Sequence, residues 1–446
     1  MNSRLNSPLQ RLLLALALLA PLSADTVKDR EGAVRSDREK MTAQDRWIYN
    51  DTDKAFADAK AAGKPVLVVL RCVPCLGCAG LDSSINDDPV LAPILDKFVC
   101  LRLINVNALD LSRFQFDYDL SLSALILNAD GTTYGRYGSW KHQKDPAETS
   151  TAGLQATLAA ALAIHQNYPA NKASLETKQP APLPYKTPLE IPEIANNPNA
   201  FTEDLDWQGK VVQSCLHCHQ IGDGLKAAYH DKQEHVPLFL SHPTPSPATI
   251  GFDLSPDHCG TVTTVVPKSS AATGGLRAGD EILTVNGAPI ISPADFSWAL
   301  HNLRGESLDL LIQRNSEKIS LSIKLPDDWR LETDISRRVG TWPMRAWIGG
   351  GMKLRDLTDE ERKARDIPST QLALLAEHVG QYNEHAAAMR NGFQKGDILI
   401  RIDELDTRLT ESKLIALLLK KYPKPTTLKA TILRDGKELP LTFPIQ

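Results

Sequence analysis

Aromatic residues and methionine are scarce in this sequence of 446 residues, since aromatics make up 6% of it and methionine occurs five times. An excess of charge of one sign is missing too, because 50 basic residues face 54 acidic ones and leave a net charge of −4. This balance gives no case for binding to nucleic acid or to an anionic membrane surface. Long apolar runs are also missing beyond the N-terminus, which excludes further membrane-spanning segments. The length remaining after that run suits three or four domains.

The N-terminal run has the features of an export signal. Arg4 and Arg11 precede the apolar residues 12–20, and small residues follow them. A basic start, an apolar core shorter than a membrane span and a small-residue exit are typical of a secretory signal peptide. We therefore expect residues 1–24 to direct export to the periplasm or another extracytoplasmic space. An uncleaved N-terminal membrane anchor is the alternative.

Seven cysteines are too few and too clustered for a disulfide scaffold. Three lie close together (Cys72, Cys75, Cys78), two share a second motif (Cys215, Cys218), and Cys100 and Cys259 stand alone. This distribution predicts redox sites on separate domains.

The second motif, Cys215-Leu216-His217-Cys218-His219, has the attachment pattern of a c-type haem. Two thiols three positions apart can each bond one vinyl group of the porphyrin, and His219 would then be an axial ligand of the iron. Such attachment takes place on the exported side, which agrees with the signal peptide. We therefore expect haem c at Cys215 and Cys218. Zinc binding and a plain dithiol pair are the alternatives.

The sixth iron ligand is not evident from this segment. Residues 200–243 form a short cytochrome c-like unit of about half the usual length. The candidates for the distal ligand are the histidines of the segment (His230, His235, His242) and two methionines beyond the next domain (Met344, Met352). His242 is the first candidate, because Ser241 and Pro243 frame it in a rigid approach. A five-coordinate iron is the alternative.

Residues 45–168 alternate between helical and strand patterns. A helix is expected over 53–62, and Gly63 supplies its C-terminal cap. Residues 65–70 are continuously apolar and β-branched, as in a strand buried on both faces. Further strands are expected over 98–106 and 124–128, so the pattern predicts an α/β domain.

The run Ala62-Gly63-Lys64-Pro65-Val66-Leu67, followed by Leu81-Asp82, resembles the thioredoxin-like family in its exported branch. The resemblance covers 44–168 and implies a C-x-x-C at Cys75 and Cys78, with Cys72 as a third thiol nearby. A thiol at a helix N-terminus becomes a nucleophile, so Cys75 would attack a disulfide and Cys78 would resolve it.

One departure from the family bears on activity. The place of the family's cis-proline reads Ser121-Leu122-Ser123 in this sequence. Its absence leaves disulfide reductase activity open, and it makes metal binding by the three cysteines an alternative. A Pro-rich stretch, 169–199, follows the domain and is expected to be an extended spacer.

The C-terminal part contains an internal repeat, in which residues 275–283 align with 392–400 at an offset of 117. In each copy glycine permits a tight turn, an acidic residue ends it, and a buried strand follows. The pattern resembles the PDZ family as it occurs in exported HtrA-type proteases, and it implies PDZ-like domains at 245–328 and 350–446. No serine-nucleophile motif accompanies them.

The PDZ resemblance implies capture of an extended peptide or protein C-terminus, which is added as a strand. The matching residues are Gly251, Phe252, Asp253 and Leu254 in the first copy, and Gly351, Met352, Lys353 and Leu354 in the second. The alternative is that one or both copies only pack against the rest of the chain.

As a whole the sequence resembles a group of exported bacterial thioredoxin-like/PDZ proteins, some of which are selenoproteins. The expected fold is multidomain, α/β plus β-rich: a thioredoxin-like domain, a short c-haem-type helical segment and two PDZ-like domains. The expected function is an exported thiol–disulfide oxidoreductase with a c-type haem, an electron-transfer partner and a client recruited by PDZ domains. The alternative is a non-enzymatic PDZ binding or assembly protein whose cysteine motifs are structural or bind metal.

Overall fold

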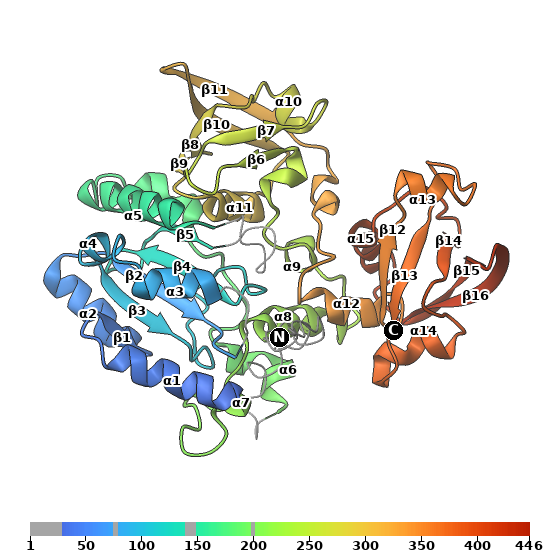
Figure 1. Cartoon of the computed structure of the whole chain (residues 1–446), viewed down its shortest axis with the longest axis horizontal. Coiled ribbons are helices and arrows are strands. Elements are labelled where there is room, and N and C mark those ends of the chain that lie inside the picture. The colour runs from blue at the N-terminus through green and yellow to red at the C-terminus, as the bar shows by residue number, and fades with distance from the viewer. Residues whose placement is uncertain (1–28, 75–78, 139–148, 198–200) are drawn as a thin grey trace, which may run out of the picture.

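The computed structural model describes residues 29–74, 79–138, 149–197 and 201–446. In these residues the chain is mixed α/β and forms four sheets. Figure 1 shows the N-terminal sheet beside the strands β6 to β11, with the strands β12 to β16 set apart and α8, α9 and α12 lying between.

The N-terminal sheet has the strand order β1-β3-β2-β4-β5. Its strands are β1 (Trp47–Tyr49), β2 (Val66–Arg71), β3 (Val99–Leu103), β4 (Leu122–Leu127) and β5 (Thr133–Tyr137). β1 and β2 run parallel to β3, whereas β4 runs antiparallel to β2 and β5. Every residue of β2 is buried, as the apolar run predicted for a strand covered on both faces.

Five α-helices accompany this sheet: α1 (Arg30–Thr42), α2 (Thr52–Ala62), α3 (Ala79–Asp87), α4 (Ala92–Leu95) and α5 (Thr151–Gln166). The expected helix over 53–62 is α2, which begins where the Asp51 side chain accepts the backbone N–H of Lys54. It ends at Gly63, whose φ of 61° is the left-handed conformation that glycine adopts without strain.

The Pro-rich stretch differs from the expected spacer. It contains η3 (Lys172–Lys178), η4 (Pro188–Glu190) and α6 (Pro192–Ala195). Leu175, Ile191 and Ile194 are at most 5% exposed and belong to the apolar clusters of the N-terminal sheet. The proline spacing did not reveal that these apolar residues cover the sheet.

Short helices follow: α7 (Val211–Ser214), α8 (Cys218–His230) and α9 (Leu238–Ser241). α8 continues the N-terminal core, because Leu216, Ile221 and Leu225 share an apolar cluster with β2 and β3. The segment around the second cysteine motif therefore packs on the N-terminal domain instead of forming a core of its own.

The first C-terminal module has a four-stranded sheet, β11-β10-β8-β9, and a pair, β6-β7. Its elements are η5 (Pro247–Ile250), β6 (Phe252–Leu254), β7 (Val262–Val265), α10 (Ser270–Thr273), β8 (Glu281–Val285), β9 (Ala288–Pro289), α11 (Pro293–Asn302), β10 (Ser307–Arg314) and β11 (Glu317–Lys324). A connector with η6 (Trp329–Glu332) and α12 (Thr341–Trp347) leads to the second module.

The second module has one sheet with the order β12-β13-β14-β15-β16. Its elements are β12 (Met352–Asp356), α13 (Asp359–Lys363), β13 (Leu374–Val379), η7 (Asn383–Ala386), α14 (Ala387–Arg390), β14 (Ile398–Ile402), α15 (Glu411–Lys421), β15 (Thr426–Arg434) and β16 (Lys437–Ile445).

The two copies of the sequence repeat have the same hydrogen-bonded turn. Nε and Nη2 of Arg314 bond the two carboxylate oxygens of Asp280 at 2.6 and 2.7 Å. Arg434 bonds Asp397 through the same atoms at the same distances. In each copy Nη2 also donates to the carbonyl of the glycine that opens the turn, at 2.8 Å. The sequence repeat is therefore a structural repeat, held by a buried acid and an arginine from the end of a strand.

The first module is fixed to the N-terminal domain by α11. Lys178 Nζ and Asp295 Oδ2 form an ion pair at 2.5 Å in which neither side chain is more than 4% exposed. The guanidinium of Arg136, on β5, lies 3.8 Å from the ring centroid of Trp298. These contacts make one unit of the N-terminal sheet and the first module.

Within the described ranges, no helix is long and apolar enough to cross a membrane. The expected signal peptide, 1–24, lies outside those ranges.

Candidate functional site

The first cysteine motif begins at the end of β2. Cys72 follows the strand directly and is 6% exposed, and its backbone N–H donates to the carbonyl of Ser121 at 2.8 Å. Ser121 belongs to the stretch in which the resemblance would place a cis-proline, and here its carbonyl accepts from Cys72. Cys75 and Cys78 lie outside the described residues.

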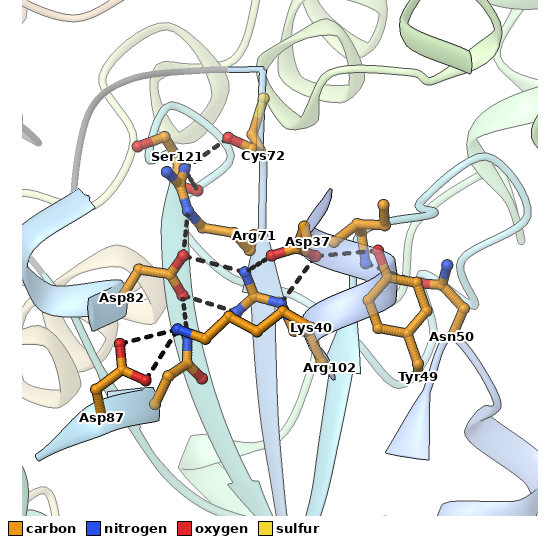
Figure 2. A network of polar contacts seen from close by, with 12 residues as sticks. Asp37, Lys40, Tyr49, Asn50, Arg71, Cys72, Asp82, Asp87, Arg102 and Ser121 are labelled. Carbon is orange, nitrogen blue, oxygen red and sulfur yellow. Dashed lines mark hydrogen bonds and ion pairs between the residues drawn. The ribbon is translucent and has the colours of Figure 1, made fainter. Parts of the chain in front are cut away.

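A buried network of charges lies beside this motif (Figure 2). Asp82, in the first turn of α3, accepts from Arg102 Nη1 at 2.7 Å and from Arg71 Nε at 3.1 Å. Arg102, which is fully buried, also bonds the carboxylate of Asp37. Asp37 in turn accepts from the Tyr49 hydroxyl at 3.0 Å. The network ties α1, β2, β3 and α3 together.

In this network the arginines outweigh the effect of burial on the charge of Asp82. Burial by itself would raise the pKa of Asp82, but hydrogen bonds and charge from Arg102 and then Arg71 outweigh it and hold that pKa below its ordinary value. The carboxylate is therefore kept charged although it is mostly buried. Because Asp82 is fixed to the last residue of β2, the start of α3 is fixed relative to Cys72.

The second cysteine motif forms the start of α8. His217 is the N-cap residue and Cys218 is the first residue of the helix; the Gln220 side chain accepts the His217 backbone N–H at 2.8 Å. Cys215 and Cys218 are each 5% exposed. The capping position places His217 at the N-terminal end of α8.

The two cysteine motifs meet at one contact. Cys72 Sγ lies 3.3 Å from His217 Nδ1, although the two residues are 145 positions apart in the sequence. A thiol and an imidazole at this distance can exchange a proton, as nucleophilic cysteines and their histidine bases do. The geometry thus places the end of β2 and the C-x-x-C-H motif in a single thiol–imidazole site.

His219 is held by a carboxylate on the next turn of α8. Its Nδ1 lies 2.9 Å from Asp223 Oδ2, and Asp223 Oδ1 lies 3.1 Å from Lys226 Nζ. A carboxylate at Nδ1 fixes the ring orientation and the tautomer, with Nδ1 protonated. This arrangement orients the imidazole and suits either a ligand or a proton-transfer role.

A covalent haem fits the surroundings of Cys215 poorly. The Cys215 thiol lies 3.6 Å from the carbonyl oxygen of Ile104 and packs with Val34, Leu205 and Val211. Cys218 belongs to the separate apolar cluster of the sheet. A porphyrin bonded to both sulfurs would have to displace these contacts, so the residues present do not fit a covalently bound haem.

His242 is not available as a distal ligand in this arrangement. Its side chain is fully buried; Nε2–H donates to the carbonyl of Ser412 at 3.0 Å, and Nδ1 lies 3.0 Å from the Ser241 hydroxyl. Both nitrogens are engaged within the chain. The bond from His242 to Ser412 on α15 joins residues 170 positions apart and could not be predicted from the residues around His242.

The expected peptide-binding residues lie on the first strand of each C-terminal module. Gly251 has a φ of 94° and precedes β6, whose Phe252 packs edge-on against Phe296 of α11, with 5.1 Å between ring centroids. Gly351 has a φ of 86° and precedes β12. In both modules this strand thus starts from a left-handed glycine.

Sequence reasoning overlooked His217, Arg102 and Asp37. His217 was visible inside the motif, and the signal that could have singled it out is its N-cap position before a helix with glutamine three residues later. Nothing in the sequence pairs Arg102 with Asp37.

Two family models match parts of the chain. A thioredoxin-like model matches residues 47–129, and a PDZ domain model matches residues 261–314. The chain therefore contains a thioredoxin-like domain and a PDZ domain, as the sequence predicted.

The curated relatives each match about two fifths of the chain. A probable periplasmic serine endoprotease, DegP-like, from Pseudomonas savastanoi pv. phaseolicola is 30% identical over 186 residues, which are 41% of this chain and 36% of the relative. A protein of the same description from Pseudomonas putida (strain GB-1) is 29% identical over the same shares. The chain thus spans about a third of the length of these relatives.

Among solved structures, an HtrA-type protease AlgW with decapeptide is 18% identical, over 38% of this chain and 50% of that chain, with a TM-score of 0.21. A TM-score of this size does not indicate a shared overall arrangement.

Proposed function

We propose that the protein is an exported thiol–disulfide oxidoreductase whose PDZ part recruits a peptide or protein client. The observation that supports the proposal is the contact between Cys72 Sγ and His217 Nδ1, because it brings a cysteine of the thioredoxin-like domain against a residue inside the second C-x-x-C. The periplasmic description of the DegP-like relatives supports export, in agreement with the N-terminal signal pattern.

The reaction is a two-electron exchange. The thiolate of Cys75 attacks one sulfur of a client disulfide, a mixed disulfide forms, and the other client sulfur leaves as a thiolate. The thiolate of Cys78 then attacks the sulfur of Cys75 and releases the second client thiol. The client gains two electrons and two protons, and Cys75 and Cys78 are left as a disulfide.

The second motif would return the pair to its reduced form. Cys215 and Cys218, as a dithiol, reduce the Cys75–Cys78 disulfide by the same exchange and become oxidised themselves, and an external dithiol donor then reduces them. His217 accepts the proton of an attacking thiol and returns it to a leaving thiolate, since its Nδ1 faces the cysteine loop at Cys72.

A metal-binding reading has support from the same contact. Thiolate sulfur and neutral imidazole nitrogen are the ligands that zinc prefers in structural sites. Cys72 and His217 supply two such ligands. The described residues bring no third ligand to them, so a zinc site would need Cys75 or Cys78, and the protein would then be a binding or assembly protein.

Insulin reduction by dithiothreitol separates the two readings. The full-length exported protein should accelerate the precipitation of reduced insulin, and Cys75→Ser should abolish the acceleration. Cys100→Ser is the matched control, because Cys100 is a buried core thiol whose pKa burial raises to about 12, so that it stays a thiol at neutral pH. Equal, negligible activity of wild type and Cys75→Ser would refute the oxidoreductase.

A further inference from the structure

The first strand of the second module, β12, is an edge strand. It pairs with β13 on one side, from Met352 opposite Val379 to Asp356 opposite Leu374. A PDZ-type module captures a peptide by pairing it with such an edge, so that the edge N–H groups donate to the peptide carbonyls. The state of this edge therefore decides whether the module is open to a ligand.

In this structure a side chain of α15 already accepts a hydrogen bond from one N–H group of this edge. The backbone N–H of Leu354 donates to Glu411 Oε1 at 2.8 Å in a buried contact. A peptide carbonyl that paired with Leu354 would have to displace the carboxylate. Glu411, the first residue of α15, thus accepts the hydrogen bond that a carbonyl of a bound peptide would accept.

Glu411 is held in that position by Arg345 of the connector. Nε and Nη2 of Arg345 bond the two carboxylate oxygens at 2.9 and 2.6 Å, and the two side chains are 2% and 3% exposed. Arg345 Nη2 also donates to the carbonyl of Ser336 at 2.6 Å. A bidentate pair of this kind is geometrically specific, so the carboxylate cannot turn away from Leu354 while Arg345 stays bonded.

The connector is bonded to α15 at a second place. The backbone N–H of Ile335 donates to the Ser412 hydroxyl at 2.9 Å. The Ile335 side chain is fully buried in the same apolar cluster as Leu354 and Ile415. An apolar side chain of the chain itself therefore occupies the core next to the groove-forming strand and helix.

The loop before β12 is engaged as well. Its N–H groups donate within the chain: that of Gly349 to the Pro444 carbonyl at 3.1 Å and that of Gly351 to the Arg345 carbonyl at 2.7 Å. A PDZ-type loop holds a peptide carboxylate with backbone N–H groups, and these two are already bonded within the chain. Arg345 thus takes part at both ends: its carbonyl accepts from Gly351, and its guanidinium holds the carboxylate that accepts from Leu354.

The first module has no residue equivalent to Glu411 that could accept from its strand edge. Its helix α11 and helix α15 begin in the same way, with Ser292 and Thr410 as capping residues. The next residue is Pro293 in α11 and Glu411 in α15. A proline side chain has no acceptor, so the closed arrangement belongs to the second copy alone.

We propose that the second copy is a latent peptide-binding module, closed by its own connector through Arg345 and Glu411, which takes a peptide C-terminus only when Glu411 releases Leu354. The inference rests on the proposed recruitment of clients and assigns a regulation to it. In the closed state recruitment falls to the first copy.

The test uses the full-length exported protein, wild type and Arg345→Met/Glu411→Ala, with Lys413→Met as the matched control. Lys413 lies on the same turn of α15, and its ion pair with Glu332 is partly exposed, with side chains 26% and 52% exposed. Hydrogen exchange at the Leu354 amide should be about tenfold to a hundredfold faster in the double variant, as expected for loss of a bond to a charged acceptor. The control and the amides of β15 should keep wild-type rates.

Peptide binding is measured by fluorescence anisotropy with a labelled decapeptide that ends in three apolar residues and a free carboxylate. The double variant should bind one more peptide per chain than wild type, and the same peptide with an amidated C-terminus should lose that site. Unchanged exchange at Leu354, or wild-type binding that protects 352–356, would overturn the closed state. So would a double variant that exposes Leu354 and gains no site.

The proposed function fails separately from this inference. Wild-type protein that shows no peptide protection at 252–254 would argue against recruitment by the first copy, whereas a site gained at 352–356 would still support the latent second copy. Arg345→Gln is the milder variant should the double variant not fold, because it leaves Glu411 in place. It should speed exchange at Leu354 by less than the double variant does.

Discussion

Cys72 Sγ and His217 Nδ1 lie 3.3 Å apart, one at the end of β2 and the other at the start of α8. Both positions are fixed by local structure, since the Cys72 N–H is bonded to Ser121 and His217 caps a helix. The contact therefore belongs to the packed fold, and it is the point through which the two cysteine motifs can act on one another.

A double-mutant cycle tests whether this contact works in the reaction. Cys72→Ser and His217→Gln should each slow insulin reduction, and the double variant should be no slower than the worse single one. Residues that act as a unit show coupling of about 0.5–3 kcal/mol, which appears here as non-additive losses. The measurement is the initial rate of insulin precipitation; losses that simply add would contradict a joint role.

Arg102→Met should destabilise the thioredoxin-like domain strongly. Arg102 is fully buried between Asp37 and Asp82, and its loss leaves two carboxylates, 10% and 16% exposed, without their main partner. Removal of one member of a buried ion pair costs about 3–5 kcal/mol. Urea unfolding measures the change, and Lys40→Met is the control, because its ion pair with Asp87 is exposed and is worth at most about 1 kcal/mol. Equal losses in both variants would refute the network's role.

Acid should unfold the wild-type domain through the same network. The pKa of Asp82 is lowered in the folded protein, so its ionised form adds stability above the ordinary carboxyl range and that stability is lost as the pH falls below about 4. In Arg102→Met the carboxylate loses its main partner, and this part of the pH dependence should shrink. Urea midpoints between pH 3 and pH 7 measure it; parallel curves would contradict it.

Local patterns predicted local structure well. The apolar run of β2, the cap at Gly63 and the repeat around Asp280 and Asp397 were all readable, because each depends on residues close in sequence or on a repeated motif. Gly63 could be assigned as a helix cap because helices commonly end at a residue in the left-handed conformation, which glycine adopts most easily.

Long-range contacts were not readable. Ile191 and Ile194 look like parts of a spacer in the sequence, yet they complete the core of the sheet. The partners of Arg102 are 65 and 20 positions away, and a single sequence holds no signal that pairs them. His242 shows the same limit, because its bond to Ser412 spans 170 positions.

His242 should make the joint between α9 and α15 sensitive to mild acid. Burial lowers its pKa to about 4, against the opposing effect of its bond to Ser412, and the charges of Arg330 and Arg338 lower it further. Because the unfolded residue binds a proton near pH 6.5, stability should fall from there to about pH 4, by about 3 kcal/mol in all.

Thermal unfolding across that range checks the prediction. His242→Asn, which can still donate to a carbonyl, should flatten the decline between pH 6.5 and pH 4. His235→Asn is the control, since His235 is exposed. A decline that survives in His242→Asn would assign the acid sensitivity to other groups.

The haem, free-thiol and zinc content of the purified protein shows which chemistry Cys215 and Cys218 have. The packing of Cys215 against Ile104 leads us to expect two thiols there and no thioether-bound haem, even in an exporting host that has haem-maturation machinery. Such protein should be colourless, and thiol titration in denaturant should lose two equivalents in Cys215→Ala/Cys218→Ala. Red protein whose colour survives acid–acetone extraction would instead restore the haem reading of the motif. One zinc per chain, absent from that double variant, would show that these thiols bind metal, and the electron return assigned to them would then have to come from elsewhere.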